Sequence, residues 1–302
     1  MSGRKRIRYR VGTASWTDPT LLESGFYPPS ANTAAARLQY YAAHFDTVEV
    51  DSTFYALPSE RNSYLWAQRT PEDFLFHIKA FAALTQHPVE LRQLPLAVRE
   101  RLGSEAKPTE PGQRVKVDSG EALELCFSMF AAALSPLERA GKLGCLLFQF
   151  PPWFTAREEN ERYLDYCRAQ LPTYRLAIEF RHRSWFGERA EHTLAFLHER
   201  GLVHVILDLP AAPSLPATPF ASTSDMAYVR LHGRNREAWF GRHERASERF
   251  RYLYSNEELT ELAQKIRRLR GATEVQVIFN NCYSDYGVRN ALTMTKLLRE
   301  EP

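Results

Sequence analysis

Eight short apolar runs, most of them followed by a stretch with helical periodicity, run through this chain of 302 residues. The runs cover residues 8–13, 47–50, 74–79, 143–150, 175–180, 203–207, 227–231 and 274–279. Strands that are joined by helices pair in parallel, because a parallel connection needs a long crossover. The alternation therefore predicts an α/β protein built on a parallel sheet.

Eight strand and helix units in about 300 residues fit a (β/α)8 barrel, whose usual size is about 250 residues plus insertions. The alternative is a doubly wound open sheet, which in its dinucleotide-binding form carries GxGxxG after the first strand. Here that turn reads GTASW at residues 12–16, which lacks this fingerprint. We therefore predict a single (β/α)8 TIM-like barrel over residues 1–302.

Two connections depart from the alternation. The segment from Thr85 to Asp118 is polar and rich in Pro, Arg and Glu, which predicts a long insertion after the third strand. The connection from Pro210 to Phe220 holds four prolines and shows no helical pattern. The main helices are expected at residues 33–44, 60–68, 119–139, 157–170, 188–200, 256–270 and 285–298, with Ser119 as an N-cap.

Composition and charge exclude several classes of protein. The four cysteines form no CxxC pair and lie among apolar or aromatic neighbours, which is typical of buried thiols and not of a zinc ribbon or disulfide framework. We expect neither a secretory signal nor a membrane span, because the first ten residues are polar and no stretch approaches about 20 apolar residues. The net charge of +3 does not by itself indicate nucleic acid. The expectation is a soluble, cytoplasmic protein with no membrane partner.

Polar side chains stand at the carboxyl ends of seven of the eight predicted strands, where a barrel carries its active site. They are Glu49, Lys79, Gln149, Glu179 with Arg181 and His182, Asp208, Arg230 with His232, and Asn280 with Asn281. An apolar strand has no structural need for these groups, so their repetition predicts a polar cluster at one mouth of the barrel. Trp16, Tyr55 and Trp185, in nearby loops, complete the predicted substrate-binding set.

The mixture of charges at these strand ends is compatible with more than one chemistry. Glu49 lies between two valines, where a charge needs a partner. A carboxylate beside cations has a lowered pKa, whereas one beside another carboxylate has a raised pKa. The sequence leaves open which case applies. Glu49, Glu179 and Lys79 are the candidate catalytic residues, with one of the two glutamates as general base.

Arginines and aromatic residues alternate in the loop from Arg230 to Arg251. This loop holds seven arginines and three glutamates, a net charge of +4, interleaved with Trp239, Phe240, Phe250 and Tyr252. Arginine presents paired donors to phosphate, and aromatic rings offer stacking surfaces. The pattern indicates either a phosphodiester or nucleotide site, or a solvated loop whose aromatic residues pack on the barrel rim.

Metal ligands are sparse at the predicted mouth. Among the nine histidines, His182 and His232 fall just past strand ends, and the chain has no HExxH or HxH motif. Together with Glu179 and Asp208 they form the one constellation that we retain as an alternative metal site. Otherwise we expect no cofactor.

Several short blocks, in order along the chain, resemble the YecE-like family, also called domain of unknown function 72. They lie at residues 12–16, 26–28, 48–55, 148–152 (FQFPP), 179–185 (EFRHRSW), 230–234 (RLHGR), 279–281 (FNN) and 290–291. The resemblance spans about residues 8–299 and implies a TIM-like barrel whose activity is not established. The family commonly has Ser-Gly where this chain has Ala14-Ser15, which predicts a different shape for the first loop. The segment 85–118 also looks longer than the family pattern.

Three functions remain open. The first is a ligand-binding barrel, hydrolytic if it is an enzyme, for a phosphate-bearing small molecule or nucleic acid that Lys79, Arg181, Arg230 and His232 neutralise. The second is a carbohydrate-active hydrolase that uses Glu49 and Glu179. A direct salt bridge from each carboxylate to Lys79 or an arginine, together with the absence of an open cleft, would count against it. The third is a non-catalytic binding or adaptor protein, in which the charged groups of the mouth form a closed structural network and the Arg-rich loop binds a partner.

Overall fold

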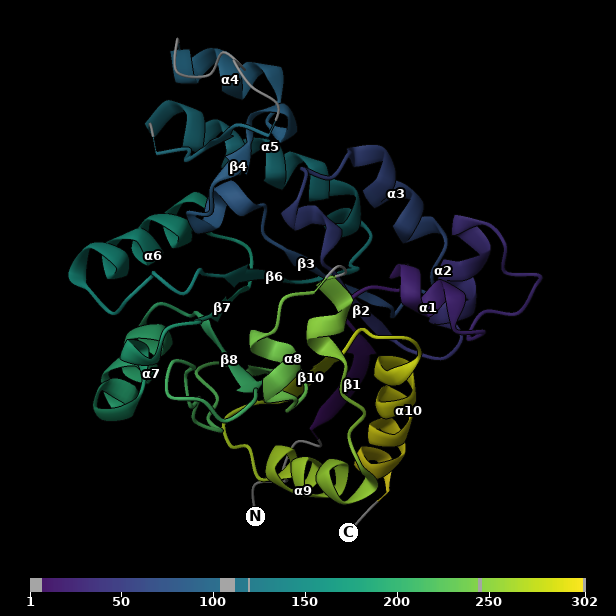
Figure 1. Ribbon diagram of the computed structural model, residues 1–302. Coiled ribbons are helices and arrows are strands. Elements are labelled where there is room, and N and C mark those ends of the chain that lie inside the picture. The colour runs from purple at the N-terminus through teal and green to yellow at the C-terminus, as the bar shows by residue number, and fades with distance from the viewer. Residues whose placement is uncertain (1–6, 104–111, 119, 244–245, 301–302) are drawn as a thin grey trace, which may run out of the picture.

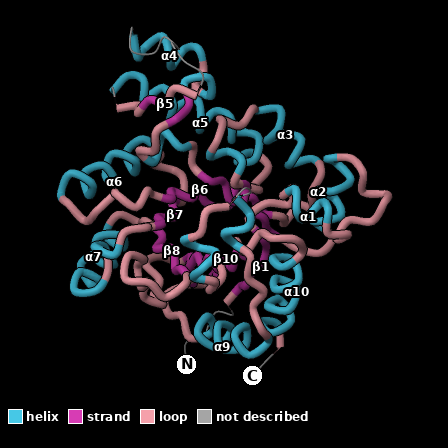
Figure 2. The backbone as a smooth tube through the Cα atoms, viewed as in Figure 1, coloured by secondary structure: helices cyan, strands magenta, loops and turns pink. Residues whose placement is uncertain are grey.

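The computed structural model describes residues 7–103, 112–118, 120–243 and 246–300. Eight parallel strands form a nearly closed barrel at its centre (Figures 1 and 2). They are β1 Arg8–Thr13, β2 Thr47–Val50, β3 Leu75–Lys79, β6 Leu143–Gln149, β7 Leu176–Glu179, β8 Val203–Asp208, β9 Met226–Leu231 and β10 Glu274–Phe279. Each agrees with a predicted run to within one residue at either end, and the predicted TIM-like α/β barrel is confirmed.

The seam of the barrel lies between β1 and β2, because the strand order is β1-β10-β9-β8-β7-β6-β3-β2. A single bridge from Ala14 to Glu49 joins the two edges, and the Ser15 N–H donates to the Glu49 carbonyl at 2.9 Å. Gly12 permits this close approach, since a Cβ there would lie 2.2 Å from the Thr47 carbonyl oxygen. Any larger residue at position 12 would push the seam apart.

Helices surround the barrel (Figure 1). The longer ones were predicted and are α2 Ala34–Ala42, α3 Glu60–Gln68, α5 Gly120–Arg139, α6 Glu158–Gln170, α7 Ala190–Glu199, α9 Asn256–Arg267 and α10 Tyr286–Arg299. Sequence periodicity missed α1 Pro19–Glu23, α4 Leu96–Leu102 and α8 Arg236–Phe240, because elements of five to seven residues are too short to show it. The predicted N-cap of α5, Ser119, lies outside the described residues.

The two unusual connections have different structures. The proline-rich stretch between β8 and β9 holds no helix, and these strands still pair in parallel. The insertion after β3, in contrast, contains secondary structure: β4 Val89–Glu90 pairs antiparallel with β5 Arg114–Val115, and α4 lies beside them. The described part of this insertion projects from one side of the barrel, next to α5 (Figure 1).

One helix is relevant to the expectation about membrane spans. Among the described residues, α5 alone is long and apolar enough to cross a membrane, by length and composition only, and half of that stretch is buried inside the protein. Its apolar residues include Phe127, Phe130 and Leu134, which belong to the hydrophobic core between the barrel and its helices. The apolar character of α5 is therefore accounted for by its packing in this layer.

Candidate functional site

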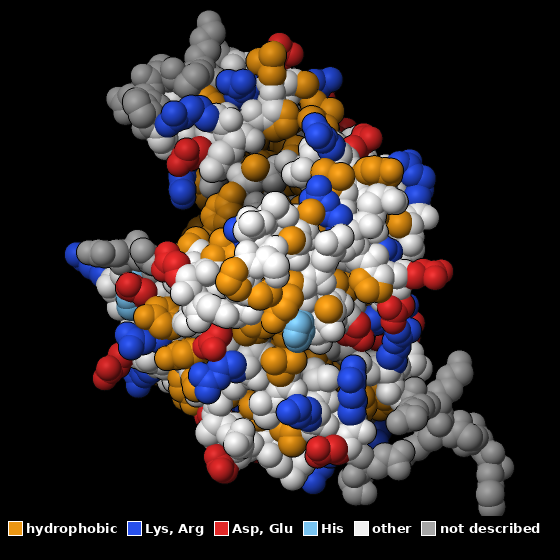
Figure 3. Space-filling view, turned by 90° about the vertical axis from the view of Figure 1, so that its right-hand side faces the viewer, with side chains coloured by type: hydrophobic (Ala, Val, Ile, Leu, Met, Phe, Trp, Pro, Cys, Tyr) orange, Lys and Arg blue, Asp and Glu red, His pale blue; other side chains and the backbone are white. Residues whose placement is uncertain are grey.

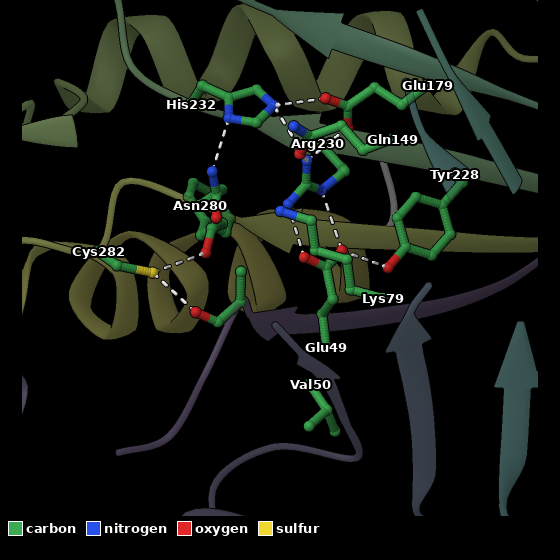
Figure 4. A network of polar contacts seen from close by, with 12 residues as sticks. Glu49, Val50, Lys79, Gln149, Glu179, Tyr228, Arg230, His232, Asn280 and Cys282 are labelled. Atoms are coloured by element: carbon green, nitrogen blue, oxygen red, sulfur yellow. Dashed lines mark hydrogen bonds and ion pairs between the residues drawn. The ribbon is translucent and has the colours of Figure 1, made fainter. Parts of the chain in front are cut away.

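Arg230, near the end of β9, lies at the mouth of the barrel between two carboxylates (Figure 4). Its Nε and Nη2 donate to Glu49 at 3.0 and 2.6 Å, and its Nη1 donates to Glu179. The Tyr228 hydroxyl also donates to Glu49, at 2.8 Å. All four side chains are at most 1% exposed. Glu49 thus has the partner that a buried charge requires.

The local sequence explains how these groups converge. Side chains alternate between the two faces of a strand, so Tyr228, Arg230 and His232 share one face of β9 and its extension. Gln149 and Glu179 are register partners on the neighbouring strands β6 and β7. Because all eight strands are parallel, their carboxyl ends meet at the same end of the barrel.

His232 and Arg181 extend the network toward the rim. Arg181 pairs through Nε with Glu179, and its Nη2 lies 3.5 Å from His232 Nε2. The Nδ1 of His232 lies 2.7 Å from the amide nitrogen of Asn280. Burial, reinforced by the neighbouring cations, lowers the pKa of His232 well below its usual value. The imidazole is therefore neutral at pH 7.

The surroundings of Glu179 resolve the question that the sequence left open for this residue. Burial alone would raise the pKa of Glu179, but Arg181 and Arg230 outweigh it and the pKa is lowered. A carboxylate that two guanidinium groups hold ionised is a weak base. Together with the ion pairs of Glu49, this makes the two glutamates counter-ions that fix Arg230, which argues against the general-base role predicted for them. Each glutamate thus forms a direct ion pair with an arginine, which is the first of the two findings that would count against a carbohydrate-active hydrolase.

Lys79 lies at the end of β3. Among the cations of the mouth, its charge is the least balanced by direct contacts with acceptors. Its ammonium lies 4.5 Å from the centre of the Phe54 ring, and it makes no hydrogen bond or ion pair with any described residue. Burial and the charge of Arg230 lower the pKa of Lys79 to about 8, although Glu49 and Glu179 act in the opposite direction. The position thus holds a partly buried ammonium that no carboxylate contacts directly.

Asp51 lies just past β2 and complements Lys79. Burial raises the pKa of Asp51 to about 6, even though the charge of Lys79 lowers it. Two groups whose pKa values lie on either side of neutral pH are suited to proton transfer there. Sequence reasoning did not select Asp51, although strand alternation from Glu49 indicates it.

Two predicted substrate-binding aromatics lie in the core and not in the mouth. Trp16 is 7% exposed and meets the rings of Trp66 and Phe76 edge-on. Trp185 is 1% exposed and stacks on Phe180 with ring centres 3.9 Å apart. Both fill the layer between sheet and helices, because the loops after β1 and β7 turn these rings outward from the barrel axis. Tyr55, in contrast, is 58% exposed at the rim.

Three predicted polar residues hold loops together. His182 caps the following turn, since its Nδ1 accepts from the Ser184 N–H at 3.1 Å and lies 2.8 Å from the Ser184 hydroxyl. Asp208 accepts from Arg234 at 2.8 and 2.9 Å and from Tyr254 at 2.7 Å. Asn281 donates to the Tyr252 carbonyl at 2.8 Å and to Asn290 at 2.9 Å.

The alternative metal site is not formed. Within the described residues, no group of three or more His, Cys, Asp and Glu side chains is arranged to hold a metal ion. The proposed ligands are used elsewhere, since Asp208 binds Arg234, His182 binds Ser184, and Glu179 binds two arginines. His182, His232, Glu179 and Asp208 are therefore not grouped as metal ligands in this structure.

The described part of the Arg-rich loop packs on the rim of the mouth, and α8 lies across the barrel in Figure 1. Trp239 is buried, its ring centre lies 5.8 Å from that of His232, and the Arg181 guanidinium lies 5.4 Å from its ring centre. Arg251 lies over Tyr283 at 5.1 Å. Of the four interleaved aromatic residues, Phe240 alone is more than half exposed. The loop thus fits the rim-packing interpretation better than that of an open stacking surface.

The fold and this mouth define a parallel α/β barrel with a buried polar cluster at the carboxyl ends of its strands. The chain belongs to the family described as "Protein of unknown function DUF72", which matches residues 10–302. It is 32% identical over 295 residues to UPF0759 protein YunF of Bacillus subtilis (strain 168), covering 95% of this chain and 94% of that protein. It is 29% identical over 203 residues to UPF0759 protein YecE of Escherichia coli (strain K12), covering 66% of this chain and 58% of that protein. The resemblance found in the sequence is confirmed.

Solved structures of the same family share the barrel. A DUF72 family protein of Enterococcus faecalis V583 superposes with a TM-score of 0.76 at 26% identity, covering 97% of this chain and 96% of that one. A DUF72 family protein of Thermotoga maritima MSB8 superposes with a TM-score of 0.74 at 31% identity, covering 97% of this chain and all of that one. These likenesses extend over nearly the whole chain, so the barrel is the shared fold of these proteins.

Proposed function

We propose that the mouth of the barrel binds a phosphate-bearing ligand, a nucleotide or nucleic acid, through Lys79 and Arg181. The observation that supports this most strongly is the ammonium of Lys79, which is partly buried and has no direct acceptor among the described residues. Removing an unpaired cation from water lowers the stability of the free protein. An anion placed against it offsets that cost, so a phosphate group suits this position.

The other cations of the mouth have different roles in this proposal. Arg230 is already bound by Glu49 and Glu179, and its positive charge adds to the field at the mouth. Arg181 pairs with Glu179 through Nε alone, which leaves N–H groups on its terminal nitrogens for a ligand. Guanidinium groups bind phosphate oxygens in pairs, whereas an ammonium acts as a point charge. Arg181 therefore orients the phosphate and Lys79 neutralises it.

If the bound phosphoester is hydrolysed, Asp51 is the proton donor that its raised pKa and its place just past β2 favour. A bound dianion next to Asp51 raises the pKa of this carboxyl further above about 6, so the group is protonated when the ligand is present. Water attacks the phosphorus and releases a proton to solvent, the bond from phosphorus to the leaving oxygen breaks, and the protonated Asp51 gives its proton to that oxygen. Glu49 and Glu179 are less suited, because Arg230 contacts both carboxylates.

The test is a titration of the purified protein with inorganic phosphate, pyrophosphate and nucleotides, followed by calorimetry and thermal shift. We expect binding that weakens with added salt, and a loss of about ten-fold or more in affinity for Lys79→Gln and for Arg181→Gln. Lys265→Gln is the matched control, since Lys265 is exposed on α9 and pairs with Glu261. Absence of binding and of any thermal shift at low salt would overturn the proposal.

The adaptor hypothesis makes the opposite prediction and stays a prediction. It places the binding surface on the Arg-rich loop, where Arg236 and Arg242 are exposed. Reversing their charge would then abolish partner binding, while Lys79→Gln would leave it unchanged. The phosphate proposal expects Lys79→Gln to have the larger effect.

A further inference from the structure

Four aromatic side chains form a continuous strip beside Lys79. The ring centres of Tyr55 and Phe54 are 5.3 Å apart, those of Phe54 and His87 are 5.0 Å apart, and those of His87 and Trp153 are 5.8 Å apart. These residues come from the segments that follow β2, β3 and β6, so three separate loops build one surface. We call these four residues the aromatic strip.

The two ends of the aromatic strip are open to solvent. Tyr55 is 58% and Trp153 is 60% exposed, which places them among the most exposed large hydrophobic side chains of the described residues. Figure 3 shows hydrophobic side chains in the hollow below the projecting insertion. Exposed aromatic rings that are fixed by ring contacts on one side present their free faces to a ligand at little cost in side-chain entropy.

The strip lies next to the cations that the proposed function uses. The ammonium of Lys79 is 4.5 Å from the Phe54 ring centre. Burial, together with the charges of Lys79 and Arg181, lowers the pKa of His87 to about 4. His87 is therefore a neutral ring that lies within the electrostatic reach of both cations. A ligand with an anionic end and a flat end fits this arrangement.

The contacts of His87 fit a tautomer with the proton on Nδ1. When the Thr85 hydroxyl donates to the Ala82 carbonyl at 3.1 Å, its oxygen accepts from His87 Nδ1–H at 2.9 Å. The Nε2 atom of His87 is then an acceptor, and no described residue donates to it. An N–H group on the flat end of a ligand would satisfy it.

We propose that the aromatic strip binds a nucleobase whose phosphate lies against Lys79 and Arg181. This inference rests on the proposed function and narrows it to nucleoside phosphates, free or within a single strand. Aromatic rings stack on any base, and a base also carries the N–H donor that His87 lacks. A sugar phosphate without a base has neither the flat face nor this donor, so it leaves the strip unoccupied.

The experiment compares adenosine 5′-monophosphate with ribose 5-phosphate on the full-length protein by calorimetry. We expect the nucleotide to bind at least about ten-fold more tightly, which is the usual range for stacking of one base. Trp153→Ala and Tyr55→Ala should reduce this preference while leaving the affinity for ribose 5-phosphate unchanged. Tyr64→Ala is the matched control, because Tyr64 on α3 is 55% exposed and has no part in the strip. All three residues are exposed, so the variants are expected to fold, and far-ultraviolet circular dichroism checks this.

The outcomes separate the two proposals. If both ligands bind equally and Lys79→Gln weakens both, the strip does not bind bases and the phosphate proposal stands. If neither ligand binds, both proposals fall. If Trp153→Ala leaves the preference for the nucleotide intact, the assignment to the strip is overturned. A six-nucleotide deoxyadenosine strand that binds more tightly than the mononucleotide, with the same dependence on Trp153, supports the inference and identifies a single strand as the source of the base.

Discussion

The two ends of the barrel each hold a buried arginine between two carboxylates, but the carboxylates differ in their access to water. At the amino-terminal end, Arg10 of β1 lies 3.3 Å from Asp46 and 3.5 Å from Glu274, whose side chains are 34% and 19% exposed. At the mouth, Arg230 contacts Glu49 and Glu179, which are both fully buried. The mouth therefore concentrates more charge away from water than the opposite end does.

The ends also differ in what remains unpaired. At the amino-terminal end, Arg175 pairs with Asp225 at 3.1 Å and with Glu274 at 3.2 Å. There the buried His77, whose pKa burial lowers to about 4, contacts Gln276 at 3.0 Å. The mouth instead carries Lys79 without a direct partner among the described residues. The requirements of folding account for the first arrangement, and the second fits the phosphate-bearing ligand that we propose.

The largest expected effect is on the free energy of unfolding, when Arg230 and Arg10 are each replaced by methionine. Arg230→Met leaves two buried carboxylates without their counter-ion, so we expect a loss of about 3–5 kcal/mol in the free energy of unfolding. Arg10→Met leaves carboxylates that reach water, so its loss should be closer to about 1 kcal/mol. Urea denaturation of both variants measures the difference.

A triple variant controls for this comparison. Adding Glu49→Gln and Glu179→Gln to Arg230→Met removes the stranded charges, and part of the lost stability should return. Equal losses for Arg10→Met and Arg230→Met would show that the two ends are equivalent, and the argument from burial would then be wrong.

The next effect compares two lysines, one at each end of the barrel. Replacing each by methionine should change the free energy of unfolding in opposite directions. Lys79→Met removes a partly buried ammonium whose pKa is lowered to about 8, so we expect a gain of about 1–3 kcal/mol at pH 7 together with loss of phosphate binding. Lys142, just before β6, donates to the carbonyls of Ala67 at 2.5 Å and Thr70 at 2.7 Å. Lys142→Met leaves those acceptors without a donor and should cost about 1–3 kcal/mol. Thermal unfolding with and without phosphate measures both variants, and destabilisation by Lys79→Met would contradict the argument.

The pKa of Lys79 also predicts a pH dependence. Sulfate keeps its charge between pH 6 and pH 10, so its affinity for the mouth should fall as pH rises through about 8, where Lys79 loses its proton. In the same range the unfolded chain, with an ordinary lysine pKa of 10.5, binds more protons than the folded one. Stability relative to Lys79→Met should therefore increase between about pH 8 and pH 10.5. A sulfate affinity that stays constant from pH 7 to pH 9.5 would contradict the assignment of Lys79.

The core of the mouth is predictable from sequence because strand alternation and parallel pairing are strong constraints. They place Glu49, Glu179 and Arg230 at one end of the barrel before any contact is known. Asp51 follows from the same alternation. Which carboxylate binds which cation is not predictable, because it depends on side-chain conformation across strands that are distant in the sequence.

The positions of loop residues could not be predicted from the sequence in the same way. Trp16 and Trp185 were predicted at the mouth but turn into the core, since period-two alternation ends with the strand. His87 reaches the mouth from the insertion after β3, where the sequence shows no periodicity that would indicate its position. A residue that arrives from such a segment can be found only from the folded chain.

Backbone conformation shows the same contrast between the two ends. The helix-to-strand turns at the amino-terminal end place glycines at positive φ, and Gly201 after α7 has a φ of 60°. The three non-glycine residues with positive φ among the described residues, Ser15, Gln86 and Ser284, all lie in segments that follow the carboxyl ends of strands. Strained residues persist where function requires them more often than in purely structural turns.

Ser15→Gly is the smallest of the predicted effects and tests this contrast directly. Ser15 has a φ of 96°, a conformation that favours glycine. Relief of this strain should raise the free energy of unfolding by about 1 kcal/mol. Gly201→Ala should lower it by a similar amount, because its turn needs the positive φ of glycine. Paired urea denaturation curves measure the two shifts, and a loss of stability in Ser15→Gly would mean that the serine side chain, whose hydroxyl accepts from the Thr17 N–H at 3.1 Å, outweighs the backbone strain.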